Sequence, residues 1–310
     1  MKRTVPGLLV LLFALSACRV TGGAPPSDSP DPSDDDVGIE HPTGDEPIFM
    51  IDWQGGLVPV QYRATRTPAF VLYGDGRLIM LGAQTAEYPG PALPPLLQRT
   101  LSESGIQAIL AEVTKTGLFD ANLRLDGAMN VVADANDTVF TLNAAGREVT
   151  VSIYGLGTLM ADMDVPMISD EEIEAHRTLE ALNNSLMFED WLPADAWLDE
   201  TWESYDADAF RLYVRDVTDQ PAEDDALTPM VRDWPTNDDP AVFGEEQPLF
   251  GDGTRCGTVS GAAGATWAAE LSTARQTTLW TDANDRRYSV AARPLLPHEE
   301  GACPELSGGA

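Results

Sequence analysis

Histidine is the side chain that most often acts as a general base near neutral pH, and it occurs three times in the 310 residues, at His41, His176 and His298. A Ser-His-Asp hydrolase or a histidine-based zinc site needs its histidine inside a folded cleft with partner groups. We expect His41 in a flexible linker, His176 alone on a helix and His298 in an exposed C-terminal tail. The histidines therefore predict no catalytic site.

The nucleophile and phosphate-binding motifs of common enzyme classes are also missing from the sequence. No Gly-x-Ser-x-Gly elbow occurs, and no Ser-x-x-Lys pair forms with the only two lysines, Lys2 and Lys115. There is no Gly-x-x-x-x-Gly-Lys loop, and the pair Gly155 and Gly157 lacks the third glycine of a dinucleotide-binding loop. We predict no enzyme activity and no cofactor.

Acidic side chains are the remaining chemical resource, with 50 Asp and Glu residues in the chain. Two carboxylates that flank a sugar could hydrolyse a glycan, but no pair stands out among so many. The tetrapeptide Asp-Ala-Asn-Asp occurs at 134–137 and again at 282–285, and its oxygens suit calcium. Neither copy continues into the Gly and distal Glu of an EF-hand, and Asp and Asn are common turn residues. We therefore predict turns at both places and no metal site.

Three tryptophans, Trp191, Trp197 and Trp202, crowd the segment DWLPADAWLDETW. Exposed aromatic faces near acidic groups can form a stacking platform for a sugar ring or a cation. The same residues can instead pack a helix end against a sheet. Both interpretations stay open, and the platform is the candidate ligand site of the sequence.

The first eighteen residues have the build of an export signal. Lys2 and Arg3 precede an apolar run over 5–17, which is shorter than the roughly 20 residues that span a bilayer. The run ends in Leu15-Ser16-Ala17-Cys18, which resembles the lipobox of bacterial lipoproteins. The resemblance implies cleavage before Cys18, a diacylglycerol on its thiol and anchoring to the outer face of the cytoplasmic membrane by two or three acyl chains, palmitate among them.

The other two cysteines, Cys256 and Cys303, form an even pair in a protein that we expect to be exported. Such a pair in an oxidising compartment most often forms a disulfide bond. A redox pair or a thiol nucleophile would need a closer spacing and a partner base. We predict a structural Cys256–Cys303 disulfide.

The segment after Cys18 is rich in Pro, Gly, Ser and Asp and has little to bury, so residues 18–47 are predicted to form a flexible acidic tether. The whole chain has a formal net charge of −31. This charge repels phosphate backbones, so we expect no nucleic-acid partner.

Apolar periodicity and turn residues predict an α+β fold of antiparallel hairpins packed with a few amphipathic helices. Ser102 or Ser104 should cap one helix, and Ser169 with Glu172 has the spacing of a capping box on another. Strands and hairpins are expected at 48–53, 68–81, 138–154, 209–217 and 277–292, and helices at 102–117, 169–187 and 262–274.

A faint internal echo links LSESGIQAILAEV at 101–113 with VSGAAGATWAAEL at 259–271, so two related halves are a hypothesis beside simple convergence. The segments over 67–154 and 255–299 also resemble a group of uncharacterised exported lipoproteins of high-GC actinobacteria, which implies a compartment but no activity. We divide the chain into a signal peptide (1–17), the lipidated Cys18 with its tether (18–47), an N-terminal α+β half (48–165), a connecting helix with the Trp-rich segment (166–205) and a C-terminal α+β half (206–310).

These features favour a membrane-anchored extracytoplasmic lipoprotein that serves as a non-enzymatic binding or accessory module of the cell envelope. Its expected partners are the membrane, through the lipid, and an envelope protein or wall component. The alternative is a carboxylate-dependent envelope hydrolase that acts on wall glycans.

Overall fold

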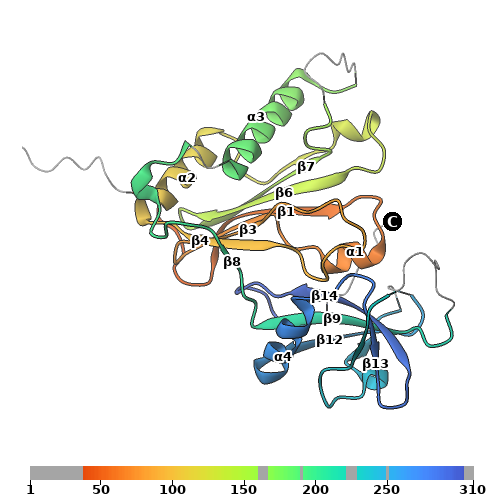
Figure 1. Cartoon of the computed structure of the whole chain (residues 1–310). Coiled ribbons are helices and arrows are strands. Elements are labelled where there is room, and N and C mark those ends of the chain that lie inside the picture. Colours follow the sequence, from red (N-terminus) through yellow and green to blue (C-terminus); the bar gives the residue numbers. More distant parts are fainter. Residues whose placement is uncertain (1–37, 160–166, 189–190, 221–228, 249–250, 304–310) are drawn as a thin grey trace, which may run out of the picture. The chain divides into compact units, whose positions relative to one another are not determined.

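The chain folds as an α+β protein with two mixed β-sheets (Figure 1), which confirms the predicted fold class. The described part lies within one compact unit, Gly38–Ala310. The signal peptide and Cys18 lie outside the described residues. No helix among the described residues is long and apolar enough to cross a membrane. The computed structural model describes residues 38–159, 167–188, 191–220, 229–248 and 251–303.

The first sheet has the strand order β5-β7-β6-β1-β2-β3-β4-β8, with β5 and β7 parallel and all other neighbours antiparallel. Its centre is the long pairing of β1 with β6, in which Phe49 lies opposite Leu142 and Gly55 opposite Asn136. The strands are β1 (Pro47–Gly55), β2 (Phe70–Tyr73), β3 (Arg77–Leu81), β4 (Leu96–Thr100), β5 (Leu123–Leu125), β6 (Asn136–Ala144), β7 (Arg147–Tyr154) and β8 (Glu203–Ser204).

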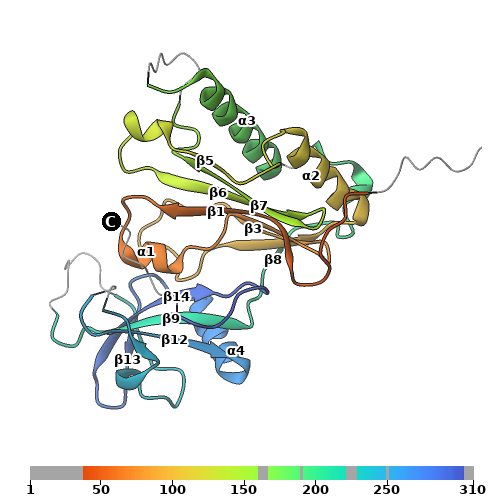
Figure 2. The same ribbon diagram turned by 180° about the vertical axis from the view of Figure 1, so that it is seen from behind.

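Two helices, α2 (Glu103–Lys115) and α3 (Asp170–Met187), cover one face of this sheet (Figure 1, Figure 2). Each begins at a predicted serine: the Ser102 hydroxyl accepts from the Gly105 N–H at 3.3 Å, and Ser169 accepts from the Glu172 N–H at 3.2 Å. A Cβ on Gly105 would lie 2.4 Å from the Ala196 carbonyl oxygen, so glycine allows the helix to approach the 3₁₀ turn η3 (Ala194–Ala196).

The capping box of α3 forms only in part. The Glu172 carboxylate does not close the box but accepts from the Gly127 N–H at 2.5 Å, at the start of the 3₁₀ turn η1 (Gly127–Asn130). The buried stripe of α3, which includes Leu179 and Leu186, belongs to the same core as the first sheet. The helix that we expected to connect the halves is therefore part of the first layer, and the chain passes between the sheets from β8 to β9.

The second sheet has the order β10-β13-β14-β9-β12-β11, and α4 (Gly261–Leu271) packs on it. Its core is a cluster of aromatic rings in which the Trp267 ring centroid lies 4.9 Å from those of both Trp234, edge to face, and Trp280, tilted. The strands are β9 (Ala209–Asp216), β10 (Val231–Asp233), β11 (Glu245–Glu246), β12 (Thr254–Ser260), β13 (Leu279–Thr281) and β14 (Arg287–Pro294), with the 3₁₀ turn η4 (Pro240–Val242).

The predicted hairpins are present in both sheets, but the two sheets differ in which strand of the second hairpin pairs with the central strand. In the first sheet, β6 pairs with the central β1 and β7 lies outside it, whereas in the second sheet the later strand β14 pairs with β9 and β13 lies outside. The sequence similarity between 101–113 and 259–271 is therefore not accompanied by an equivalent hairpin topology. A duplication that relates the two halves stays a hypothesis.

The two sheets meet through apolar and polar contacts on their facing sides. Leu296, just after β14, packs on Val71 and Ile79 of the first sheet. On the second sheet, Ala64 of the short helix α1 (Val60–Thr65) packs in a cluster with Tyr213. The strand β2 is buried along its whole length because helices cover one of its faces and the C-terminal segment the other.

Residues 38–46, which we assigned to the flexible tether, are bound to the folded part. The Gln107 side chain accepts from the Ile39 N–H at 2.7 Å and donates to the Ile39 carbonyl at 2.9 Å. His41 Nε2 lies 3.2 Å from Glu103 Oε1 at the start of α2. The prediction of a flexible tether is therefore wrong for residues 38–46. The Gln107 amide satisfies both backbone groups of Ile39, and the apolar side chain of Ile39 packs on the core.

Candidate functional site

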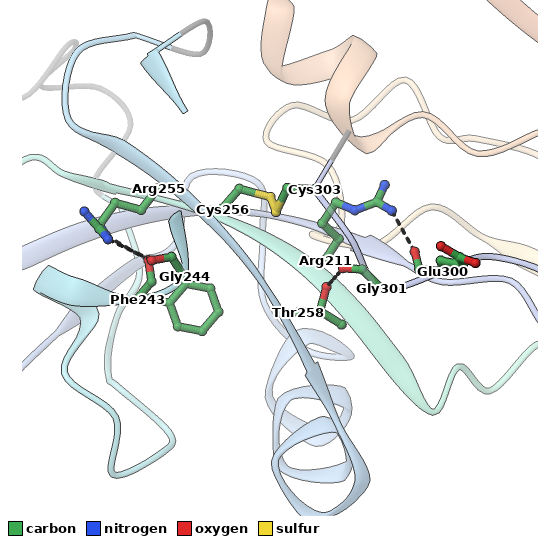
Figure 3. The surroundings of a disulfide bond; sticks show 9 residues. All are labelled: Arg211, Phe243, Gly244, Arg255, Cys256, Thr258, Glu300, Gly301 and Cys303. Carbon is green, nitrogen blue, oxygen red and sulfur yellow. Dashed lines mark hydrogen bonds between the residues drawn. A yellow bond between two sulfur atoms is a disulfide. The ribbon is translucent and has the colours of Figure 1, made fainter. Parts of the chain in front are cut away.

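The predicted disulfide is present and fastens the C-terminal segment to β12 (Figure 3). The Cα atoms of Cys256 and Cys303 lie 6.1 Å apart. Beside the disulfide, Thr258 donates to the Gly301 carbonyl, and Arg211 donates to the Glu300 carbonyl at 3.1 Å. The last described residues are thus held on the second sheet at several points.

A buried polar network lies under this segment and corrects the expectation for His298. Its Nδ1 lies 2.8 Å from the Tyr73 hydroxyl, so it is not an exposed tail residue. Arg293, 6% exposed, donates both terminal nitrogens to the Glu299 carboxylate, one of them at 2.6 Å, and donates Nε to the Arg66 carbonyl at 2.8 Å. This network could not be predicted from local sequence patterns, because Tyr73 and His298 are 225 positions apart.

The electrostatics of this network follow from burial and charge pairing. Burial alone would raise the pKa of the Glu299 carboxyl, but the hydrogen bonds and charge of Arg293 outweigh it and hold that pKa below its ordinary value. Burial lowers the pKa of His298 and raises the pKa of Tyr73. Burial also raises the pKa of Asp52, against the opposing charges of Arg293 and Arg66. The network thus holds a charged Arg–Glu pair next to neutral His and Tyr, which suits a structural clamp.

The three tryptophans of the sequence-predicted platform are divided between two places. The rings of Trp197 and Trp202 meet edge to face at 5.8 Å and pack partly on the first core. The Arg99 guanidinium lies 4.0 Å above the Trp197 ring. Trp191 donates its indole N–H to the Ser185 carbonyl at the end of α3. Trp197 already has a cation on one face, and no contact among the described residues brings Trp191 to the other two.

The second Asp-Ala-Asn-Asp segment forms the predicted turn, but the first does not, because Asn136 and Asp137 begin strand β6 and pair with β1. Asp282 accepts from the backbone N–H groups of Asn284 and Arg286 at 2.8 and 2.9 Å, and Asp285 has a φ of 62°. Asp134 has a φ of 64°. Within the described residues, no three His, Cys, Asp or Glu side chains converge as a metal-binding group.

A groove with a cavity volume of about 480 Å³ is lined by residues of the proline-rich loop (82–95), α1, the end of β1 and the second sheet. We call it the groove. The loop is fastened at its two ends: Gly82 donates its N–H to the Pro95 carbonyl at 2.7 Å, and Ala92 to the Ala274 carbonyl at 3.0 Å. Gln276 donates its N–H to the Gly90 carbonyl at 3.0 Å and so ties the second sheet to the loop.

Three aromatic side chains line the groove from separate segments: Trp53 at the end of β1, Tyr62 on α1 and Tyr88 in the loop. Tyr62 and Tyr88 are largely exposed, at 47% and 67%. The remaining lining is apolar loop carbons together with amide and hydroxyl groups such as those of Gln84 and Gln276. An apolar concave surface with a few polar groups is the usual character of a ligand site.

Arg66 is the cation of the groove. Its Nη1 donates to the Trp53 carbonyl at 2.9 Å, its guanidinium lies 5.3 Å from the centre of the Tyr62 ring, and its buried Nε has no hydrogen-bond partner. The one carboxylate in the lining is Glu87, which is paired with Arg275 at 3.2 Å. Chemically, the groove can stack flat rings, exchange hydrogen bonds with neutral polar groups and receive one negative charge.

Sequence reasoning missed the groove, because its residues are gathered from across the chain. The length of the proline-rich loop could have indicated a functional surface, since irregular connections of this size are often functional. Family models, curated proteins and solved structures were each compared with this chain and gave no match.

Proposed function

We propose that this chain is an extracytoplasmic lipoprotein, anchored in the membrane through Cys18, whose folded part is a non-enzymatic binding module of the cell envelope. The observation that carries the binding role is the groove, where Trp53, Tyr62 and Tyr88 offer aromatic surface from three separate segments. The lipobox supports the extracytoplasmic, membrane-anchored location. The disulfide also supports an extracytoplasmic location, because such bonds persist in oxidising compartments.

Binding is favoured over the alternative of a wall-glycan hydrolase by the carboxylates of the groove. Glycoside hydrolysis commonly needs two carboxyl groups that face each other across the sugar. Among the described residues that line the groove, Glu87 is the single acid, and its charge is engaged by Arg275. Asp52 and Glu299 lie in the network behind Arg66 and do not line the groove.

The binding role is tested with insoluble cell-wall material and the full-length protein in detergent. Tyr88→Ala removes an exposed ring from the groove, and Phe188→Ala removes an equally exposed ring, 72%, that does not line it. We expect Tyr88→Ala to weaken co-sedimentation about tenfold, as for a central contact residue, and Phe188→Ala to bind like wild type. Equal binding by all three proteins would refute the role of the groove.

The attachment is tested separately in growing cells. Labelling with a palmitate analogue should be present in the wild-type protein and lost in Cys18→Ser. Retention of the label in Cys18→Ser would refute the lipid assignment while leaving the groove untouched.

A further inference from the structure

Among the described residues, Arg66 forms no ion pair inside the groove, and the one carboxyl group on which its charge acts, Asp52, does not line the groove. No ion pair joins it to a carboxylate within 4.0 Å in the described part of the chain, although the sequence holds 50 acidic residues against 19 basic ones. Arg66 donates Nη1 to one carbonyl and leaves Nε buried without a partner. Nε is itself buried and closed to a ligand, so the outer nitrogen Nη2 is the one that can donate to an acceptor entering the groove.

The position of Arg66 is fixed from three sides. The Trp53 carbonyl holds Nη1, and the Tyr62 ring lies beside the guanidinium. Its own backbone carbonyl accepts from the buried Arg293, which is in turn held by Glu299. An arginine whose fork is fixed in advance loses less entropy when it receives a planar carboxylate.

The net charge of the protein does not prevent an anionic ligand from reaching Arg66. Interactions between exposed charges fade beyond about 8 Å at physiological ionic strength. The formal charge of −31 is spread over the whole chain, whereas contact with Arg66 is local. The overall charge slows the approach of the ligand, and the local contact sets how tightly it is held.

The two ends of the proline-rich loop offer few free backbone groups to an extended peptide. A peptide that adds to a sheet edge needs free backbone N–H and C=O groups. In this loop the N–H groups of Gly82 and Ala92 and the carbonyl of Gly90 are already engaged. Four positions carry no N–H at all, because they are proline: Pro89, Pro91, Pro94 and Pro95.

A glycan is recognised through side chains, and the groove provides the matching groups. The faces of Trp53, Tyr62 and Tyr88 can stack on the carbon–hydrogen surface of sugar rings. The amides of Gln84 and Gln276 both donate and accept, as sugar hydroxyl and acetamido groups do.

We propose that the groove binds an acidic glycan, with its rings on these aromatic side chains and a carboxylate of the sugar on the Arg66 guanidinium. This inference rests on the proposed binding function and adds the chemical class of the ligand. It also names Arg66 as the residue that distinguishes acidic from neutral sugars.

The test compares two tetrasaccharides that share one backbone of β-1,4-linked N-acetylglucosamine. One is neutral chitotetraose, and the other carries a lactyl carboxylate on alternate sugars, as in peptide-free wall glycan. Calorimetric titration of the full-length protein in detergent should show at least tenfold tighter binding of the acidic tetrasaccharide, with a preference that shrinks as salt is raised.

Arg66→Gln should bind the two tetrasaccharides equally while still binding the neutral one. The control is Arg63→Gln, an exposed arginine of α1 that does not line the groove, and it should keep the wild-type preference. If the wild-type protein binds both tetrasaccharides equally, the role of Arg66 is refuted but the groove remains a glycan site. If it binds neither, the proposed glycan ligand is refuted, and the co-sedimentation of Tyr88→Ala then decides the groove by itself. Should Arg66→Gln fail to fold, the wild-type comparison and its salt dependence still decide the proposal.

Discussion

The Cys256–Cys303 disulfide allows a quantitative prediction about stability. It links residues 47 apart in sequence, and the chain-entropy relation for a loop of that length gives about 4 kcal/mol at 25 °C. In the double variant Cys256→Ala and Cys303→Ala, the Arg293–Glu299 pair still holds the C-terminal segment, so the loss should come mainly from a freer unfolded chain. For a folded part of this size, the melting temperature should fall by on the order of 8 °C.

The assay is thermal unfolding of the oxidised wild type, of the double variant and of Cys18→Ala as a control for the third cysteine. Cys18 lies outside the described folded part, so its variant should melt with the wild type. A melting temperature of the double variant within about 1 °C of wild type would show that the bond does not constrain the unfolded chain as reasoned. An equal loss in Cys18→Ala would show that some other effect of cysteine removal is responsible.

Two further predictions concern buried ionisable groups. Glu299→Gln leaves the buried Arg293 without its counter-charge and should lower the free energy of unfolding in urea by about 3 to 5 kcal/mol. The control Glu300→Gln, at an exposed neighbour, should lower it little. Equal losses of unfolding free energy in the two variants would contradict the buried pair. His176 is 3% exposed with neither ring nitrogen hydrogen-bonded, and burial lowers its pKa, against the opposing charges of two nearby glutamates. Because the unfolded chain then binds the proton more tightly, stability should fall as the pH drops below about 6.5, and urea midpoints between about pH 5 and pH 8 should fall less in His176→Leu than in wild type.

Elements with local signals could be predicted from the sequence. The helices that begin after Ser102 and Ser169 combine a capping side chain with an apolar stripe, and both start where expected. The hairpin around Gly76 also has a local cause, because this residue has a φ of 87° in the turn between β2 and β3. Such features depend on residues a few positions apart.

Elements that depend on distant partners were missed. The strand β12 buries Cys256 on one face, with Ala64 of α1, and Val259 on the other, with Trp267 of α4, so its apolar residues follow no simple alternation. The two-residue strand β8 exists because it pairs with β4, about 100 positions earlier. The same limit applies to the groove, where Trp53, Tyr88 and Gln276 come together only through tertiary packing.

Hydrogen exchange of the full-length protein with and without the acidic tetrasaccharide tests the central claim most directly, because it reports where the ligand binds without altering any residue. The account predicts slower exchange in the proline-rich loop, at 83–88, and in α1, with no change around Trp197 and Trp202. Protection at the Trp197–Trp202 pair in place of the loop, or no protection at a saturating ligand concentration, would contradict it.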